Sequence, residues 1–101
     1  MIKEEIQKLL DEHVNGDPKR FGEVWDCVPD LADRIRQFVL DQDSWIYLSP
    51  QSFDGWYLVS KNGRQELYYQ EKGTNCWGTK YFENEKEAIN ELLKVTTDLE
   101  F

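Results

Sequence analysis

The sequence is poor in the residues on which most active sites depend. Its 101 residues include one histidine, two cysteines and three prolines. Covalent catalysis needs a nucleophile beside a base, and only His13 could serve as an imidazole base. Neither Cys27 nor Cys76 has the flanking residues of a cysteine hydrolase. We expect no catalytic residue and a protein that is not an enzyme; a Cys-His pair assembled only by folding is the open alternative.

Metal and cofactor motifs are also missing. Four-ligand zinc sites use short Cys-x-x-Cys or His-x-x-x-His spacings, and the chain has neither. Asp41 and Asp43 resemble the start of a calcium loop, but Trp45 occupies the place of the third oxygen ligand. Residues 73–80 have the glycine spacing of a phosphate loop with its lysine and threonine in reverse order. The sequence predicts no metal and no cofactor.

Long apolar runs are absent as well. No stretch approaches the roughly 18 apolar residues that span a bilayer, and the N-terminal MIKEE lacks the apolar segment of a secretion signal. Two cysteines are too few for the disulfide framework of a small secreted domain. We expect a cytosolic protein with reduced thiols, while a single bond between Cys27 and Cys76 stays open.

Acidic residues, in contrast, are abundant. Twenty Asp and Glu against twelve Lys and Arg give a net charge of -8. Residues 1–54 hold twelve acids and six bases, a net charge of -6, whereas residues 55–101 hold eight and six, a net charge of -2. The negative electrostatic field of such a chain repels phosphate backbones and anionic lipids, so neither nucleic acid nor a membrane is an expected partner. A charge that only keeps the protein soluble is the alternative.

Three stretches have the apolar spacing of amphipathic helices. The first covers residues 2–14 and the second residues 30–40. The third begins after Asn84, which can cap a helix because Glu87 follows three residues later. A weaker helical pattern over residues 19–29 is interrupted by a proline, so a short helix there is left open.

The segment between the second and third helices has the character of a sheet. A β-prone run occupies residues 45–48, residues 71–78 are expected to form a loop, and another strand is expected at residues 79–82. Asn62-Gly63 predicts a type I′ hairpin turn, since both central residues of that turn need a positive φ. This turn sets the register, pairing Leu58 with Leu67, Trp56 with Tyr69, Tyr57 with Tyr68 and Val59 with Glu66.

The register also sorts the two faces of the hairpin. We expect the face with Leu58 and Leu67 on the core, while the face with Tyr57 and Tyr68 is either half covered or a binding platform. With 40% hydrophobic and 14% aromatic residues, the chain can build one core. The prediction is one α+β domain over residues 1–101: two N-terminal helices, a three- to four-stranded antiparallel meander and a C-terminal helix in a two-layer sandwich.

The acidic chain, the two N-terminal helices, the meander around WYLVSKNG at residues 56–63 and the closing helix at FENEKEA, residues 82–88, together resemble the immunity proteins of bacterial contact-dependent inhibition and other polymorphic toxin systems. The resemblance implies a cytosolic monomer that forms a heterodimer with a cognate toxin domain and blocks its active site or substrate-binding surface. Such toxins are commonly nucleases with basic surfaces, toward which an acidic inhibitor is steered.

We expect the toxin-binding residues to be the acids around the second helix and the loop after it, together with three aromatic residues that serve as anchors. Core packing is the alternative role of each aromatic residue. The acids are Glu23, Asp26, Asp30, Asp33, Asp41, Asp43 and Asp54, and the anchors are Trp25, Trp45 and Tyr57.

The alternative function is a small acidic interaction or regulatory domain with a non-toxin partner. Double-stranded RNA-binding domains have a similar order of elements. Those domains need lysines at a helix start, where this chain has Asn-Glu-Lys-Glu at residues 84–87.

Overall fold

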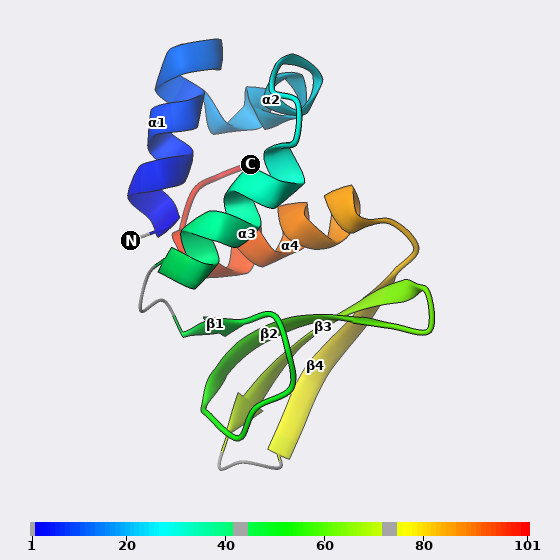
Figure 1. The fold of residues 1–101 in the computed structure, drawn as a ribbon. Helices are drawn as coiled ribbons and strands as arrows, with labels where there is room; N and C mark the ends of the chain where they lie inside the picture. Colours follow the sequence, from blue (N-terminus) through cyan, green and yellow to red (C-terminus); the bar gives the residue numbers. More distant parts are fainter. Residues whose placement is uncertain (1, 42–44, 72–74) are drawn as a thin grey trace.

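The computed structural model describes residues 2–41, 45–71 and 75–101 and has an α+β fold, as the sequence predicts (Figure 1). Its elements in chain order are α1 (Ile2–Val14), the 3₁₀ helix η1 (Pro18–Arg20), α2 (Phe21–Cys27), α3 (Leu31–Asp41), β1 (Ile46–Tyr47), β2 (Gly55–Lys61), β3 (Arg64–Glu71), β4 (Asn75–Phe82) and α4 (Glu85–Thr97).

The helices form two tiers above one face of the sheet. Helices α3 and α4 lie next to the sheet, and α1 and α2 lie on their far side (Figure 1). Helix α4 can be enclosed in this way because its apolar stripe is wide: Ala88, Ile89, Leu92 and Leu93 are all buried. The second tier is a departure from the expected two-layer sandwich.

The weak helical pattern before Pro29 forms a helix after all. Helix α2 packs beside α1, and the chain passes from it into α3 through Asp30, which has a φ of 59°. Proline cannot continue a helix, so α2 ends before Pro29 and α3 starts after it. The described residues therefore contain three α-helices before the sheet instead of the expected two.

The β2–β3 hairpin has the predicted turn and register. Asn62 and Gly63 have φ values of 53° and 80°, as a type I′ turn requires, and all four predicted cross-strand pairs are present. The same register puts Leu58 and Leu67 in the main core, as expected. Asn84 caps α4 as predicted, since its Oδ1 accepts a hydrogen bond of 2.9 Å from the amide of Glu87.

The sheet is mixed, in contrast to the antiparallel meander expected from the sequence. Strand β1 runs parallel to β2, with Ile46 opposite Trp56, and the sheet order is β1-β2-β3-β4. Parallel neighbours usually need a crossover of a dozen or more residues. Here β1 is only two residues long, so the connection at residues 48–54 is long enough to return the chain to the level at which β1 begins.

Strand β4 begins earlier than expected. Cys76 and Trp77, assigned to a loop, pair with Gln70 and Tyr69 of β3. A β-bulge then interrupts the ladder, and Gly78 has a φ of 68° there, a conformation that glycine adopts without strain. Pairing with β3 therefore overrides the loop signal of the glycine.

Candidate functional site

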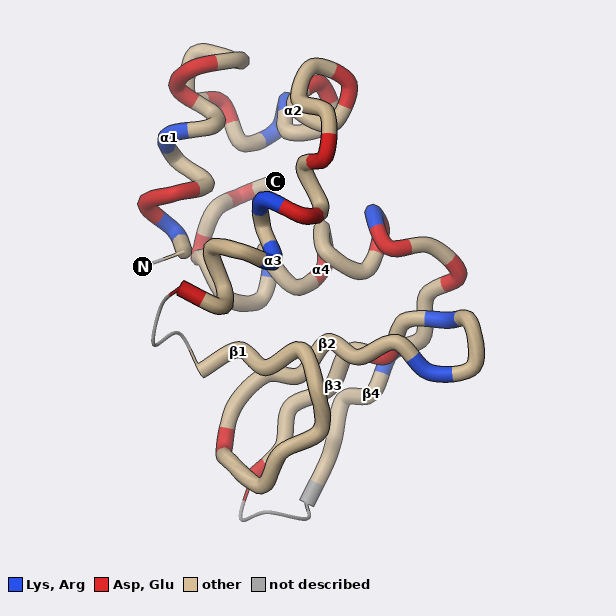
Figure 2. Tube along the Cα trace, in the orientation of Figure 1, with Lys and Arg blue, Asp and Glu red and all other residues tan. Residues whose placement is uncertain are grey.

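Four of the predicted acids lie along α2 and the first turn of α3. Glu23 and Asp26 belong to α2, Asp30 lies between the helices, and Asp33 is in the first turn of α3. All four are exposed, and we call them the α2–α3 acidic surface. Figure 2 shows acidic segments gathered on these helices, whereas the tip of the β2–β3 hairpin is basic.

One of these acids is neutralised by a neighbour. The Arg20 guanidinium donates two hydrogen bonds to the Glu23 carboxylate, with Nε to Oε2 at 2.7 Å and Nη2 to Oε1 at 3.0 Å. These bonds lower the pKa of Glu23 below its ordinary value. Within the described residues no base forms an ion pair with Asp26, Asp30 or Asp33. These three carboxylates therefore form no ion pair in the described part of the chain, although Arg34 follows Asp33 directly on α3.

Another part of the predicted site lies at the opposite end of α3. At ~1.5 Å per residue, Asp41 lies about 16 Å along the helix from its start. Trp45 follows near this end and is 61% exposed. Asp54 is exposed and precedes β2, where the amide of Trp56 donates a 2.9 Å hydrogen bond to the Trp45 carbonyl. Asp43 lies outside the described residues. The structure thus divides the predicted site into two surfaces.

Trp25 joins two helices. Its indole Nε1 donates a 2.8 Å hydrogen bond to Oδ1 of Asn90 on α4, and its ring meets Phe21 edge to face at a centroid distance of 6.3 Å. Lys86 Nζ lies 5.9 Å from the centre of the ring. Packing and polar contacts therefore hold Trp25, which is only half-buried, in place between α2 and α4.

Tyr57 is fully buried, which corrects its expected role as a surface anchor. On the sheet face away from the helices, its ring stacks on Tyr68 at 5.2 Å and lies 5.0 Å from Tyr47. Its hydroxyl donates a 2.7 Å hydrogen bond to the carbonyl of Phe53, and Gln70 Nε2 donates to the carbonyl of residue 51 at 2.8 Å. The segment at residues 48–54 therefore covers this part of the sheet.

Burial in this aromatic cluster raises the pKa values of Tyr57 and Tyr68 above the ordinary value of 10.0. The unfolded chain therefore loses these protons at a lower pH than the folded chain does. The stabilisation is fully present below about pH 10 and is lost as the pH rises through the folded-state pKa values. We expect urea unfolding midpoints to fall as the pH rises above about 10, and to fall less in Tyr57→Phe. Equal declines in the two proteins would contradict this assignment.

Sequence patterns did not reveal a groove beside Trp45. Val39 and Leu40 of α3 line it on one side and Ile46 and Leu48 on the other, and its volume is about 380 Å³. Leu40 is 68% exposed. The one feature of the sequence that could have indicated this groove is Leu40, an apolar residue that lies outside the apolar stripe of α3.

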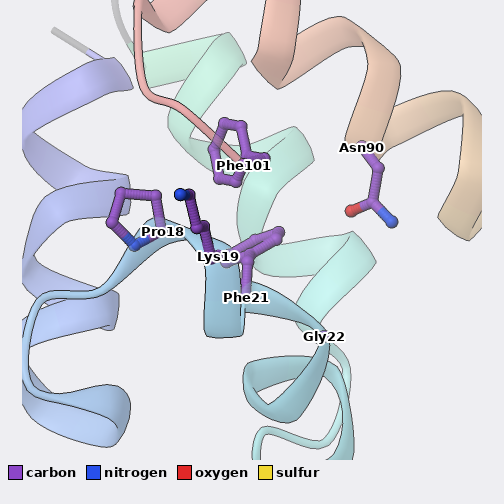
Figure 3. Close-up of a pocket in the computed structure, with 6 residues that line it drawn as sticks. All are labelled: Pro18, Lys19, Phe21, Gly22, Asn90 and Phe101. Atoms are coloured by element: carbon purple, nitrogen blue, oxygen red, sulfur yellow. The ribbon is translucent and has the colours of Figure 1, made fainter.

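A second hollow lies between η1, α2, α4 and the C-terminus, and Figure 3 shows its lining side chains. Its volume is about 170 Å³, below the range of roughly 300–1,000 Å³ that is usual for ligand pockets. The rings of Phe21 and Phe101 lie 5.1 Å apart beside it. This hollow belongs to the packing of the C-terminal segment.

Groups that could support chemistry are dispersed. His13 lies on α1 with Nε2 3.8 Å from Oε2 of Glu12. Cys27 and Cys76 are free thiols. No three His, Cys, Asp or Glu residues of the described chain are grouped so that they could hold a metal ion. Across the same residues, no helix is both long and apolar enough to cross a membrane.

No protein-family model, curated protein or solved structure matches this chain. The functional inference therefore rests on the surfaces of the molecule itself.

Proposed function

We propose that this protein is an immunity protein that binds a cognate bacterial toxin domain in the cytosol, in a heterodimer, and blocks its active site or substrate-binding surface. The observation that carries the proposal is the group of three exposed carboxylates on the α2–α3 acidic surface, Asp26, Asp30 and Asp33, which form no ion pair among the described residues.

The chemistry of the partner follows from this charge. A nuclease presents lysine and arginine residues that hold the phosphate backbone of its substrate. An acidic inhibitor is attracted to that same surface, and such steering raises association rates to about 10⁸–10⁹ M⁻¹s⁻¹ at low salt. The net charge of -8 adds a long-range field of the same sign. We therefore propose a basic nuclease as the toxin.

Neutralising the three carboxylates tests this proposal. In Asp26→Asn/Asp30→Asn/Asp33→Asn, we expect the association rate with the toxin domain encoded immediately upstream to fall about tenfold or more at low salt, with a smaller change in dissociation. Asparagine suits position 30 because it tolerates a positive φ. Stopped-flow fluorescence at two salt concentrations measures both effects.

The matched control is Glu23→Gln, which removes an acid already paired with Arg20 on the same surface. Its association rate should stay within about twofold of the wild type, since a paired surface charge contributes little. Equal losses in the control and the triple variant, or unchanged rates in both, would contradict the role of these carboxylates. An upstream gene product that does not bind the wild-type chain would contradict the toxin as partner.

A further inference from the structure

The groove between α3 and β1 is an open, largely apolar surface. Val39, Leu40, Ile46, Tyr47 and Leu48 supply its apolar lining, and Ser49 and Gln51 supply its polar side. Its volume of about 380 Å³ is enough for a large side chain. None of the lining residues is charged. We call this groove the α3–β1 corner, together with Asp41 and Trp45, which flank its lining residues in the sequence and do not line it themselves.

The two most exposed large apolar side chains of the described residues both belong to this corner. Leu40 is 68% exposed on α3 and Trp45 is 61% exposed just before β1. Isolated exposed apolar residues are common, but Leu40 lines the groove and Trp45 immediately precedes its lining residue Ile46. Exposed apolar residues that are grouped in one region of the surface often mark interaction sites. Tryptophan is also among the residues that most often dominate binding energy.

Stability does not explain the residue at position 45. Trp45 has a φ of 57°, in the left-handed region that bulky residues rarely adopt. Its carbonyl accepts a 2.9 Å hydrogen bond from the amide of Trp56, which any residue could provide. Glycine would satisfy the same backbone without strain. A strained and exposed tryptophan indicates that its side chain serves another molecule.

The electrostatics of the corner favour a cation. Asp41 is the last residue of α3, and the final turn of that helix contains no base. The helix dipole already places negative charge at this end, where a lysine or arginine would be stabilising and an aspartate is not. Asp41 accepts a 2.8 Å hydrogen bond from neutral Gln37, so its charge is not cancelled there. A carboxylate and the negative end of a helix therefore adjoin an apolar groove.

We infer that the α3–β1 corner is the docking site for a protein segment that presents a lysine or arginine beside a large apolar side chain. The apolar side chain enters the groove between Leu40 and Leu48, and the base meets Asp41 and the end of α3. This inference rests on the proposed function and deepens it: the α2–α3 acidic surface steers the toxin, and the corner anchors one of its segments.

A defined peptide tests the corner without the toxin. The probe is a short amphipathic peptide of leucine and lysine, and its control has glutamate in place of every lysine. We expect the leucine–lysine peptide to shift backbone amide NMR signals of residues 39–41 and 45–48, and the glutamate peptide to leave them unchanged. Shifts centred on residues 26–33, equal effects of both peptides, or no shifts at all would overturn the inference. Self-association of the chain through residues 39–48 would also overturn it.

Two variants then test the corner against the upstream toxin domain. Leu40→Asp and Trp45→Gly should each weaken equilibrium binding at least about tenfold, as loss of a central anchor does. The matched control for Leu40→Asp is Val95→Asp, since Val95 is an exposed aliphatic residue on α4. The thermal midpoint of Trp45→Gly should not fall, because the strain at position 45 is relieved.

The outcomes separate the two proposals. If Leu40→Asp and Trp45→Gly bind the toxin domain like the wild type while the triple asparagine variant is impaired, the docking inference is overturned and the immunity function stands. If the toxin domain does not bind the wild-type chain, the proposed function fails, and the peptide experiment decides whether the corner accepts a basic and apolar segment.

Discussion

Replacing Tyr57 with alanine should lower the free energy of unfolding by about 3–5 kcal/mol, which is the usual cost of deleting a buried aromatic ring. Tyr57 is fully buried, and its ring contacts those of Tyr47 and Tyr68. Small domains are stabilised by only about 5–15 kcal/mol in total, so the variant should be partly unfolded at moderate temperature. Urea denaturation followed by circular dichroism measures the change.

Tyr57→Phe is the control for this experiment. It keeps the ring and removes only the hydroxyl, which donates to the carbonyl of Phe53. Its cost should be about 1–2 kcal/mol, because the hydroxyl loses its bond to the carbonyl of Phe53 and the longer bond of 3.4 Å that it accepts from Gln70 Nε2. If Tyr57→Ala cost less than about 1 kcal/mol, the ring would not be enclosed by residues 48–54.

Gly55→Ala should destabilise the protein by about 3 kcal/mol, at the upper end of the usual cost of overpacking. A Cβ at this position would lie 2.4 Å from the carbonyl oxygen of Trp45 and 2.9 Å from Cε2 of Tyr47. The φ of 150° at Gly55 adds backbone strain for any residue with a side chain. Relief requires β1 to move away from β2, so the α3–β1 corner should lose its groove as well.

Gly22→Ala separates this effect from the general consequences of replacing glycine. Gly22 lies in α2, and no atom outside its immediate surroundings lies within 4 Å of an added Cβ. Alanine should therefore stabilise the helix by up to about 1 kcal/mol. Thermal unfolding of both variants gives the comparison, and a loss of stability in Gly22→Ala similar to that in Gly55→Ala would count against a specific clash with Trp45.

These two predictions concern the part of the molecule that carries the proposed docking site. Gly55 holds β1 against β2, and Tyr57 lies beneath the segment that returns the chain from β1 to β2. A loss of binding to the proposed toxin partner in either variant would therefore report damage to the scaffold. Only substitutions that keep the unfolding midpoint, such as Trp45→Gly, test recognition directly.

Local interactions allowed several features to be predicted from the sequence. The bounds of α1 could be predicted because apolar residues recur at helical spacing up to Val14, and Gly16 and Pro18 then stop the helix. The register of the β2–β3 hairpin follows from Asn62-Gly63, because the turn fixes which residues face each other. The cap at Asn84 likewise depends on residues within one turn of the helix. The excess of acidic residues over residues 1–54 is a property of composition alone.

The tertiary structure decided which of the candidate residues can act together. Alternation along β2 assigns Tyr57 to one face but does not show that residues 48–54 cover that face. The direction of β1 is set by its pairing with β2, where Ile46 lies opposite Trp56, and a two-residue strand has no periodicity that would reveal this pairing. The length of α3 separates Asp41 from Asp30, so one predicted acidic site became two surfaces. Short-range patterns determined the elements of this protein, whereas the groove beside Leu40 and Trp45 exists only because packing between distant segments places those elements next to each other.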